Sequence, residues 1–73
     1  MKYNGHKNWN HWNVSLWINN DEGLYNLVQS YLRSTWTKDK AAQYVFDEYF
    51  KGKETPDGAP YSVSAIRAAM VGM

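Results

Sequence analysis

The chain has 73 residues, a formal net charge of +1 and no cysteine, so disulfides and thiolate zinc ligands are excluded. We expect residues 1–73 to form a single small domain. No run approaches the roughly 18 apolar residues of a membrane span, and the first residues lack the apolar stretch of a signal peptide. Composition therefore predicts a cytoplasmic protein with no membrane partner.

Charge and size also bear on partners. The chain has eight Lys and Arg and seven Asp and Glu, and the two signs are interspersed along it. This pattern does not favour direct nucleic-acid binding, which usually recruits several clustered phosphate contacts. Because neither a disulfide nor a thiolate metal site can stabilise so small a domain, aromatic residues must supply its core, and its four Trp, six Tyr and two Phe can do so with several rings left partly at the surface. The other route to stability at this size is association, either as a homo-oligomer or with a partner.

The first predicted helix covers roughly residues 9 to 19, with Asn8 as its N-cap. One face is predicted to carry Trp12, Leu16 and Asn19. Further apolar residues widen the apolar arc: Trp9, Val14, Trp17 and Ile18. A strand is the alternative, because apolar and polar residues alternate from Trp12 to Leu16. The adjacent Trp17 and Ile18 break this alternation and favour a helix.

Three further helices are predicted. The second follows a cap at Asn20 or Asp21, and its apolar stripe is Leu24, Leu27, Val28, Tyr31, Leu32 and Thr35. The third runs from a cap at Thr37 to Gly52, and its stripe is Ala41, Ala42, Val45, Phe46, Tyr49 and Phe50. A loop over 53–60 precedes a short last helix capped by Ser62 or Ser64. The predicted fold is all-α: a small single-domain bundle of three main helices plus a short C-terminal helix.

The sequence offers little for catalysis. His6 and His11 are five residues apart, whereas metal-binding pairs on a helix are three or four apart and share one face. The acidic pairs at 21–22 and 47–48 are neighbours in sequence and point in different directions on a helix. The serines and glycines form no nucleophile or phosphate-binding motif. We therefore expect no enzyme activity, no cofactor and no metal.

Residues 8–25 hold three of the four tryptophans together with five asparagines. Such a segment is either a closely specified core or a recognition surface, because buried Trp and Asn each need hydrogen-bond partners. We expect Trp12, Leu16 and Trp17 in the core and Trp9 at the surface. The candidate partner-binding residues are Trp9, Asn10, Asn13, Asp21, Glu22 and Tyr25.

The stretch from Trp12 to Tyr25, WNVSLWINNDEGLY, resembles a family of small uncharacterised proteins from bacteriophages and other mobile elements. The resemblance covers roughly residues 3 to 32 and brings no assigned activity. It implies a phage setting, in which small non-catalytic proteins often bind and block a host protein complex, including CRISPR and other anti-phage defence effectors. The alternatives are a nucleotide or nucleic-acid binding module and a virion or assembly component.

Overall fold

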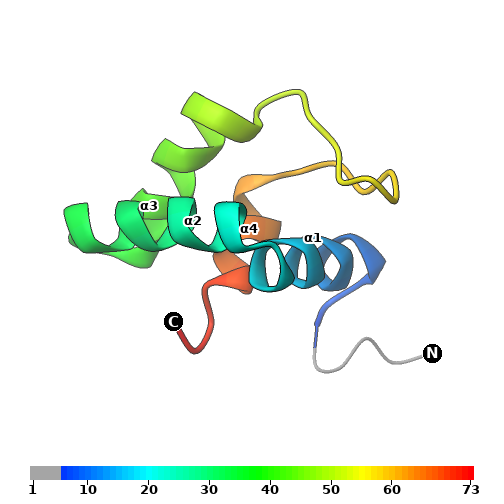
Figure 1. Cartoon of the computed structure of the whole chain (residues 1–73), viewed down its shortest axis with the longest axis horizontal. Coiled ribbons are helices and arrows are strands. Elements are labelled where there is room, and N and C mark those ends of the chain that lie inside the picture. The colour runs from blue at the N-terminus through cyan, green and yellow to red at the C-terminus, as the bar shows by residue number, and fades with distance from the viewer. Residues whose placement is uncertain (1–5) are drawn as a thin grey trace.

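The computed structural model describes residues 6–73, and these residues are mostly helical (Figure 1). The elements are α1 (Trp9–Asn20), α2 (Glu22–Ser34), α3 (Lys38–Val45), a π-helical turn η1 (Phe46–Phe50) and α4 (Val63–Ala69). The described residues form no strand; Glu54 and Pro60 make an isolated antiparallel bridge. The all-α prediction is confirmed, and the helical reading of the first segment holds over the strand alternative.

Each α-helix begins at a polar residue whose side chain accepts a backbone N–H three residues ahead. The caps are Asn8, Asp21, Thr37 and Ser62. The four donor–acceptor distances are 3.0 to 3.1 Å. A cap of this kind contributes about 1 kcal/mol, because it satisfies a backbone donor that the helix itself leaves free. The predicted caps are confirmed, with Asp21 and Ser62 taking the two positions that the sequence left open.

The third helix differs from the prediction after Val45. Instead of one α-helix up to Gly52, the chain widens into the π-helical η1, where the Lys51 N–H donates to the Phe46 carbonyl at 2.8 Å. Phe50 is buried and stacks on Tyr61, with ring centroids 4.4 Å apart. Tyr49 is half exposed, so its expected place in the core stripe is wrong. The extra residue in the turn shifts the facing of the side chains that follow it.

The core lies where α1 and α4 pack together and where α2 and α3 close over them. The largest fully buried side chains are Ile18, Ile66, Met70, Val14, Val28, Val45 and Asn13. The apolar stripes predicted for the second and third helices lie on elements that pack against each other, α2 and α3. The edge contact of Tyr31 and Tyr49, with centroids 5.9 Å apart, belongs to this region.

The facing of α1 is the main correction. Val14 and Ile18 are fully buried, whereas Leu16 is 37% exposed and Trp12 and Trp17 are only half buried. The expectation that these last three residues form the core is therefore wrong. Because α1 is apolar on both sides, the helical period alone could not decide which side turns inward. The side with the two β-branched residues packs inward, and the side with Leu16 faces out.

Candidate functional site

Much of the polar chemistry of the Trp/Asn segment is directed inward, at the loop over 53–60. Asn13 is 1% exposed. Its amide nitrogen donates to Asp57 Oδ2 at 2.9 Å, and its amide oxygen accepts from Thr55 Oγ1 at 2.6 Å. Trp17 Nε1 donates to the same Asp57 oxygen at 3.0 Å. The prediction that Asn13 contacts a partner is wrong, because its side chain is occupied in holding the loop to α1.

The loop is closed on itself as well as held by α1. Thr55 Oγ1 accepts the Ala59 N–H at 3.1 Å, and the Thr55 N–H donates to the Ala59 carbonyl at 2.8 Å. Gly58 takes a φ of 93°, which the tight turn requires and which glycine adopts without strain. The N–H groups of Asn13 and Trp17 lower the pKa of the Asp57 carboxyl below its ordinary value. The loop is thus positioned by an ionised carboxylate.

The same helix is fastened to α4 by two further side chains. Asn19 Nδ2 donates to the Ser15 carbonyl at 2.9 Å and to the Ala69 carbonyl at 3.4 Å. His11 Nε2 and Ser64 Oγ lie 3.1 Å apart. Partial burial lowers the pKa of His11, and the nearby charges of Lys7 and His6 lower it further. Over residues 6–73, no group of three or more His, Cys, Asp and Glu side chains is placed to hold a metal ion.

The remaining predicted contact residues fall into two groups at opposite ends of α1. Trp9 is 39% exposed, which confirms its expected place at the surface, and Asn10 beside it is half buried. At the other end, Glu22 is exposed and Asp21 caps α2. Tyr25 is half buried, and its hydroxyl accepts from Gln29 Nε2 at 2.9 Å. A twelve-residue helix is about 18 Å long, so the two groups do not form one compact cluster.

We call the outward side of α1 the outer face and define it by Trp9, Trp12 and Leu16. These residues follow the helical spacing of three and four. A shallow hollow of about 210 Å³ lies along this face. It is lined by His6, Trp12, Ser15, Leu16, Asn19 and Asn20. The outer face therefore presents apolar side chains between polar edges.

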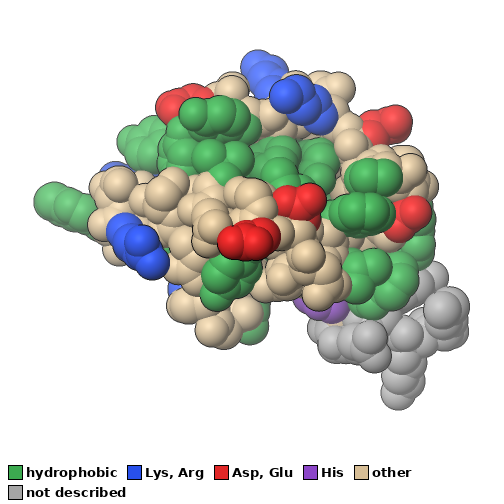
Figure 2. Space-filling model, viewed as in Figure 1, with side chains coloured by type: hydrophobic (Ala, Val, Ile, Leu, Met, Phe, Trp, Pro, Cys, Tyr) green, Lys and Arg blue, Asp and Glu red, His purple; other side chains and the backbone are tan. Residues whose placement is uncertain are grey.

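A second aromatic surface lies between α2 and α3, and sequence reasoning missed it. Trp36 is 96% exposed. A hydrophobic side chain stands clear of the molecule at the left of Figure 2, where α2 ends. The only sequence signal was that this tryptophan belongs to neither neighbouring stripe and stands between two threonines. We call its surroundings the turn surface and define it by Arg33, Trp36, Lys38, Lys40 and Tyr44.

Trp36 forms a wall of two adjacent hollows on the turn surface. One, of about 270 Å³, is lined by Ser34, Thr35, Trp36, Lys40 and Tyr44. The other, of about 240 Å³, is lined by Gln29, Leu32, Arg33, Thr35, Trp36, Thr37, Lys38 and Met73. Among the described residues that line them there are three cationic side chains and no acidic side chain.

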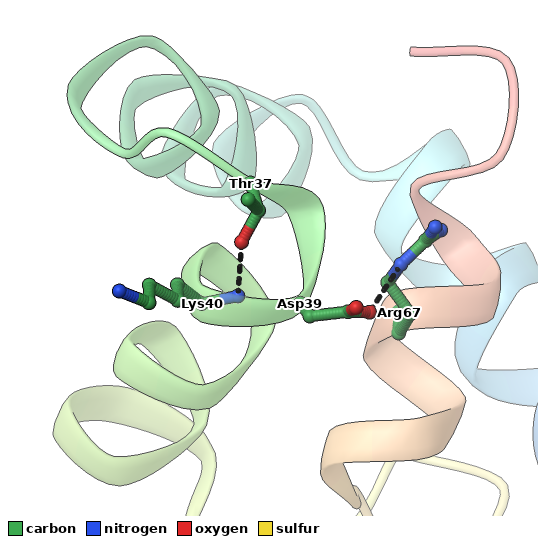
Figure 3. A network of polar contacts seen from close by, with 4 residues as sticks. All are labelled: Thr37, Asp39, Lys40 and Arg67. Atoms are coloured by element: carbon green, nitrogen blue, oxygen red, sulfur yellow. Dashed lines mark hydrogen bonds and ion pairs between the residues drawn. The ribbon is translucent and has the colours of Figure 1, made fainter.

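The acidic residue within this stretch is directed elsewhere. Asp39 Oδ1 lies 2.8 Å from Arg67 Nε in an ion pair between α3 and α4. In Figure 3, Asp39 points toward Arg67, and Lys40 points in the opposite direction. The pair leaves the lysines on either side of Asp39 on the turn surface.

Comparisons with known proteins add a family to this geometry. No curated protein and no solved structure matches the chain. Within residues 6–73, no helix has both the length and the apolar character needed to cross a membrane. A family model matches residues 1–73, so the chain belongs to a family of unknown function, DUF7249.

Proposed function

We propose that this protein is a non-catalytic, phage-encoded binding protein that docks on a host protein complex through the outer face of α1 and blocks it. The proposed target is a CRISPR or other anti-phage defence effector, as the resemblance of residues 12–25 to mobile-element proteins implies. The observation that carries the proposal is the apolar outer face itself, with Trp9 39% and Leu16 37% exposed.

Helix α1 is apolar on both sides. A helix of this kind is usually covered on both sides, because each large apolar side chain gains about 1.5–3 kcal/mol when it is removed from water. Here Val14 and Ile18 are covered by the protein's own core, and Trp9 and Leu16 on the opposite side are each more than a third exposed. A docked protein would supply the second cover.

The composition of the face also suits a protein partner. Binding energy at protein interfaces concentrates in aromatic anchors that are surrounded by polar groups. Trp9 has Asn10 beside it, and at the other end of the helix the chain continues into Asp21, Glu22 and Tyr25. A standard interface covers about 800 Å² on each partner, enough to span both ends of a helix about 18 Å long.

The test compares folded variants in a phage-protection assay with host strains that each carry one defence system. We expect Trp9→Ala and Leu16→Ser to lose inhibition, and the matched surface control Lys53→Ala to keep it. Asp21→Asn removes the charge and keeps the helix cap, so it separates the two roles of this residue. Gel filtration of the parent with the purified effector should give a complex of fixed stoichiometry. Outer-face variants that inhibit as well as the parent would overturn the docking surface.

A further inference from the structure

The turn surface has a chemistry that the proposed function does not use. Trp36 is 96% exposed, so both faces of its indole ring are open to solvent. Tyr44 of α3 is half exposed and lines the same hollow of about 270 Å³. Two aromatic rings that border one open hollow are a platform for a flat ligand, because planar rings stack on each other with little demand for exact shape.

Cations line both of the hollows that Trp36 borders. Lys40 lines the hollow shared with Tyr44, and Arg33 and Lys38 line the second hollow that Trp36 borders. Asp39 forms an ion pair with Arg67, with Oδ1 and Nε 2.8 Å apart, and it points in the direction opposite to Lys40. A ligand seated on the ring would therefore meet positive charge in whichever of the two hollows it extends into.

The net charge of the sequence does not reveal this local group of cations. The chain as a whole is nearly neutral, with a formal charge of +1. The fold nevertheless gathers three cations at the turn surface. A chain with almost no net charge can therefore still present one locally positive surface to nucleic acid.

We propose that the turn surface binds single-stranded nucleic acid, with a base stacked on Trp36 and neighbouring phosphates paired with Arg33, Lys38 and Lys40. Single strands combine a flat base with negative charge on both sides of it, which is the complement of this surface. A duplex hides its base faces in its own stack. An acidic protein segment is the competing ligand, but lysine is depleted where protein interfaces are buried, and two of the three cations here are lysines.

The inference goes beyond the proposed function and does not depend on it, since the outer face of α1 takes no part. Three phosphate contacts on a single strand predict that the logarithm of affinity falls with the logarithm of salt concentration with a slope of about −2. Base stacking on an aromatic residue contributes about 1–3 kcal/mol, which corresponds to a loss of about 5- to 150-fold in affinity when the ring is removed.

The experiment measures fluorescence anisotropy of labelled oligothymidylate and oligouridylate, each about 12 nucleotides long, at low salt and then at increasing salt. We expect the parent to bind both, Trp36→Ala to bind about 5- to 150-fold more weakly, and Trp36→Phe to retain most of the affinity. Lys38→Gln and Lys40→Gln should each reduce the salt slope by about 0.7. Trp9→Ala and Lys51→Gln are matched controls away from the site and should bind as the parent does.

Three outcomes would overturn the proposal. The first is the absence of oligonucleotide binding at low salt. The second is equal affinity of Trp36→Ala and Trp9→Ala, and the third is tighter binding of a hairpin duplex than of the single strands. If no oligonucleotide binds and Trp36→Ala still loses inhibition in the phage-protection assay, the turn surface contacts protein and the nucleic-acid inference is wrong. Loss of inhibition by outer-face variants tests the docking proposal separately.

Discussion

Asn13 shows why one short amide side chain is required at the centre of this fold. Its amide nitrogen donates to the Asp57 carboxylate and its amide oxygen accepts from the Thr55 hydroxyl, so a donor and an acceptor are both needed at one buried position. Neither aspartate nor an apolar residue offers both. Each polar group that loses such a partner inside the protein carries the full cost of its desolvation.

We predict that Asn13→Ala lowers the free energy of unfolding by about 1–3 kcal/mol, because it leaves the Thr55 hydroxyl and the Asp57 carboxylate without the amide. Asn13→Asp should cost more, since it places a second carboxylate beside Asp57. Urea denaturation measures both, and the exposed Asn20→Ala serves as the control. Equal stability of Asn13→Ala and Asn20→Ala would show that the amide does not hold the loop.

Asp57 gives the protein a dependence on pH that has a definite sign. Hydrogen bonds from Asn13 and Trp17 lower its folded-state pKa below the ordinary value of 3.8. A lowered carboxyl pKa adds stability above pH 3.8 that is lost as the pH falls through the folded-state pKa. Asp57→Asn should therefore flatten the loss of stability in this acid range. Parallel curves for variant and parent in acid denaturation would contradict the assignment.

Sequence reasoning succeeded for residues whose partners are local. Each helix cap bonds to a backbone N–H three residues ahead, so the pattern of short polar residues before apolar stripes was sufficient. The partners of Asn13 lie 42 and 44 residues away in sequence. No local pattern could show them, and the residue was assigned to the surface.

At the scale of elements, the sequence predicted where helices begin but not which side of α1 faces inward. The stripe of α2 is unambiguous because its opposite side is polar. In α1, Val14 and Ile18 on one side compete with Trp12 and Leu16 on the other, and only the packing against α4 decides between them. The apolar spacing likewise did not predict the change from the α-helix of α3 to the π-helix of η1.

The facing of α1 can be tested with two substitutions that remove the same number of atoms. Ile18 is fully buried and Leu16 is 37% exposed. Ile18→Ala should cost about 2–5 kcal/mol, because it leaves a cavity in the core. Leu16→Ala should cost well under half as much, because solvent already reaches the side chain. Thermal denaturation of the two variants decides the matter, and a larger loss for Leu16→Ala would reverse the orientation.

Gly52 ends the helical run that contains α3 and η1, and its φ of 76° lies in the region that other residues rarely adopt. A Cβ at this position would meet no atom within 4 Å, so the cost of a substitution comes from the backbone alone. We predict that Gly52→Ala destabilises the protein by about 1 kcal/mol and that Gly52→Asn costs less. Equal effects of the two in chemical denaturation would contradict this account.

At the scale of the whole molecule, the two aromatic surfaces lie far apart. The described residues span 36 Å along the longest axis. In Figure 1, α1 lies in the right half of the view, and α2 runs from the centre to the left, where it ends before the connection to α3. Sites separated by more than about 10 Å with no shared partner usually act independently. A protein of this form could hold a protein surface at one end and a nucleic-acid strand at the other.

This arrangement predicts that the two activities separate by mutation. Leu16→Ser should abolish docking on the host complex and leave oligonucleotide affinity within about twofold of the parent, since additivity between distant sites holds to within about 0.5 kcal/mol. Trp36→Ala should weaken oligonucleotide binding and leave the melting temperature unchanged, because its side chain is 96% exposed. The double variant should lose both docking on the host complex and oligonucleotide affinity, each to the extent seen in the corresponding single variant. If Leu16→Ser weakened oligonucleotide binding as much as Trp36→Ala does, while both remained folded, the two surfaces would form one site and the division of roles between α1 and the turn would be wrong.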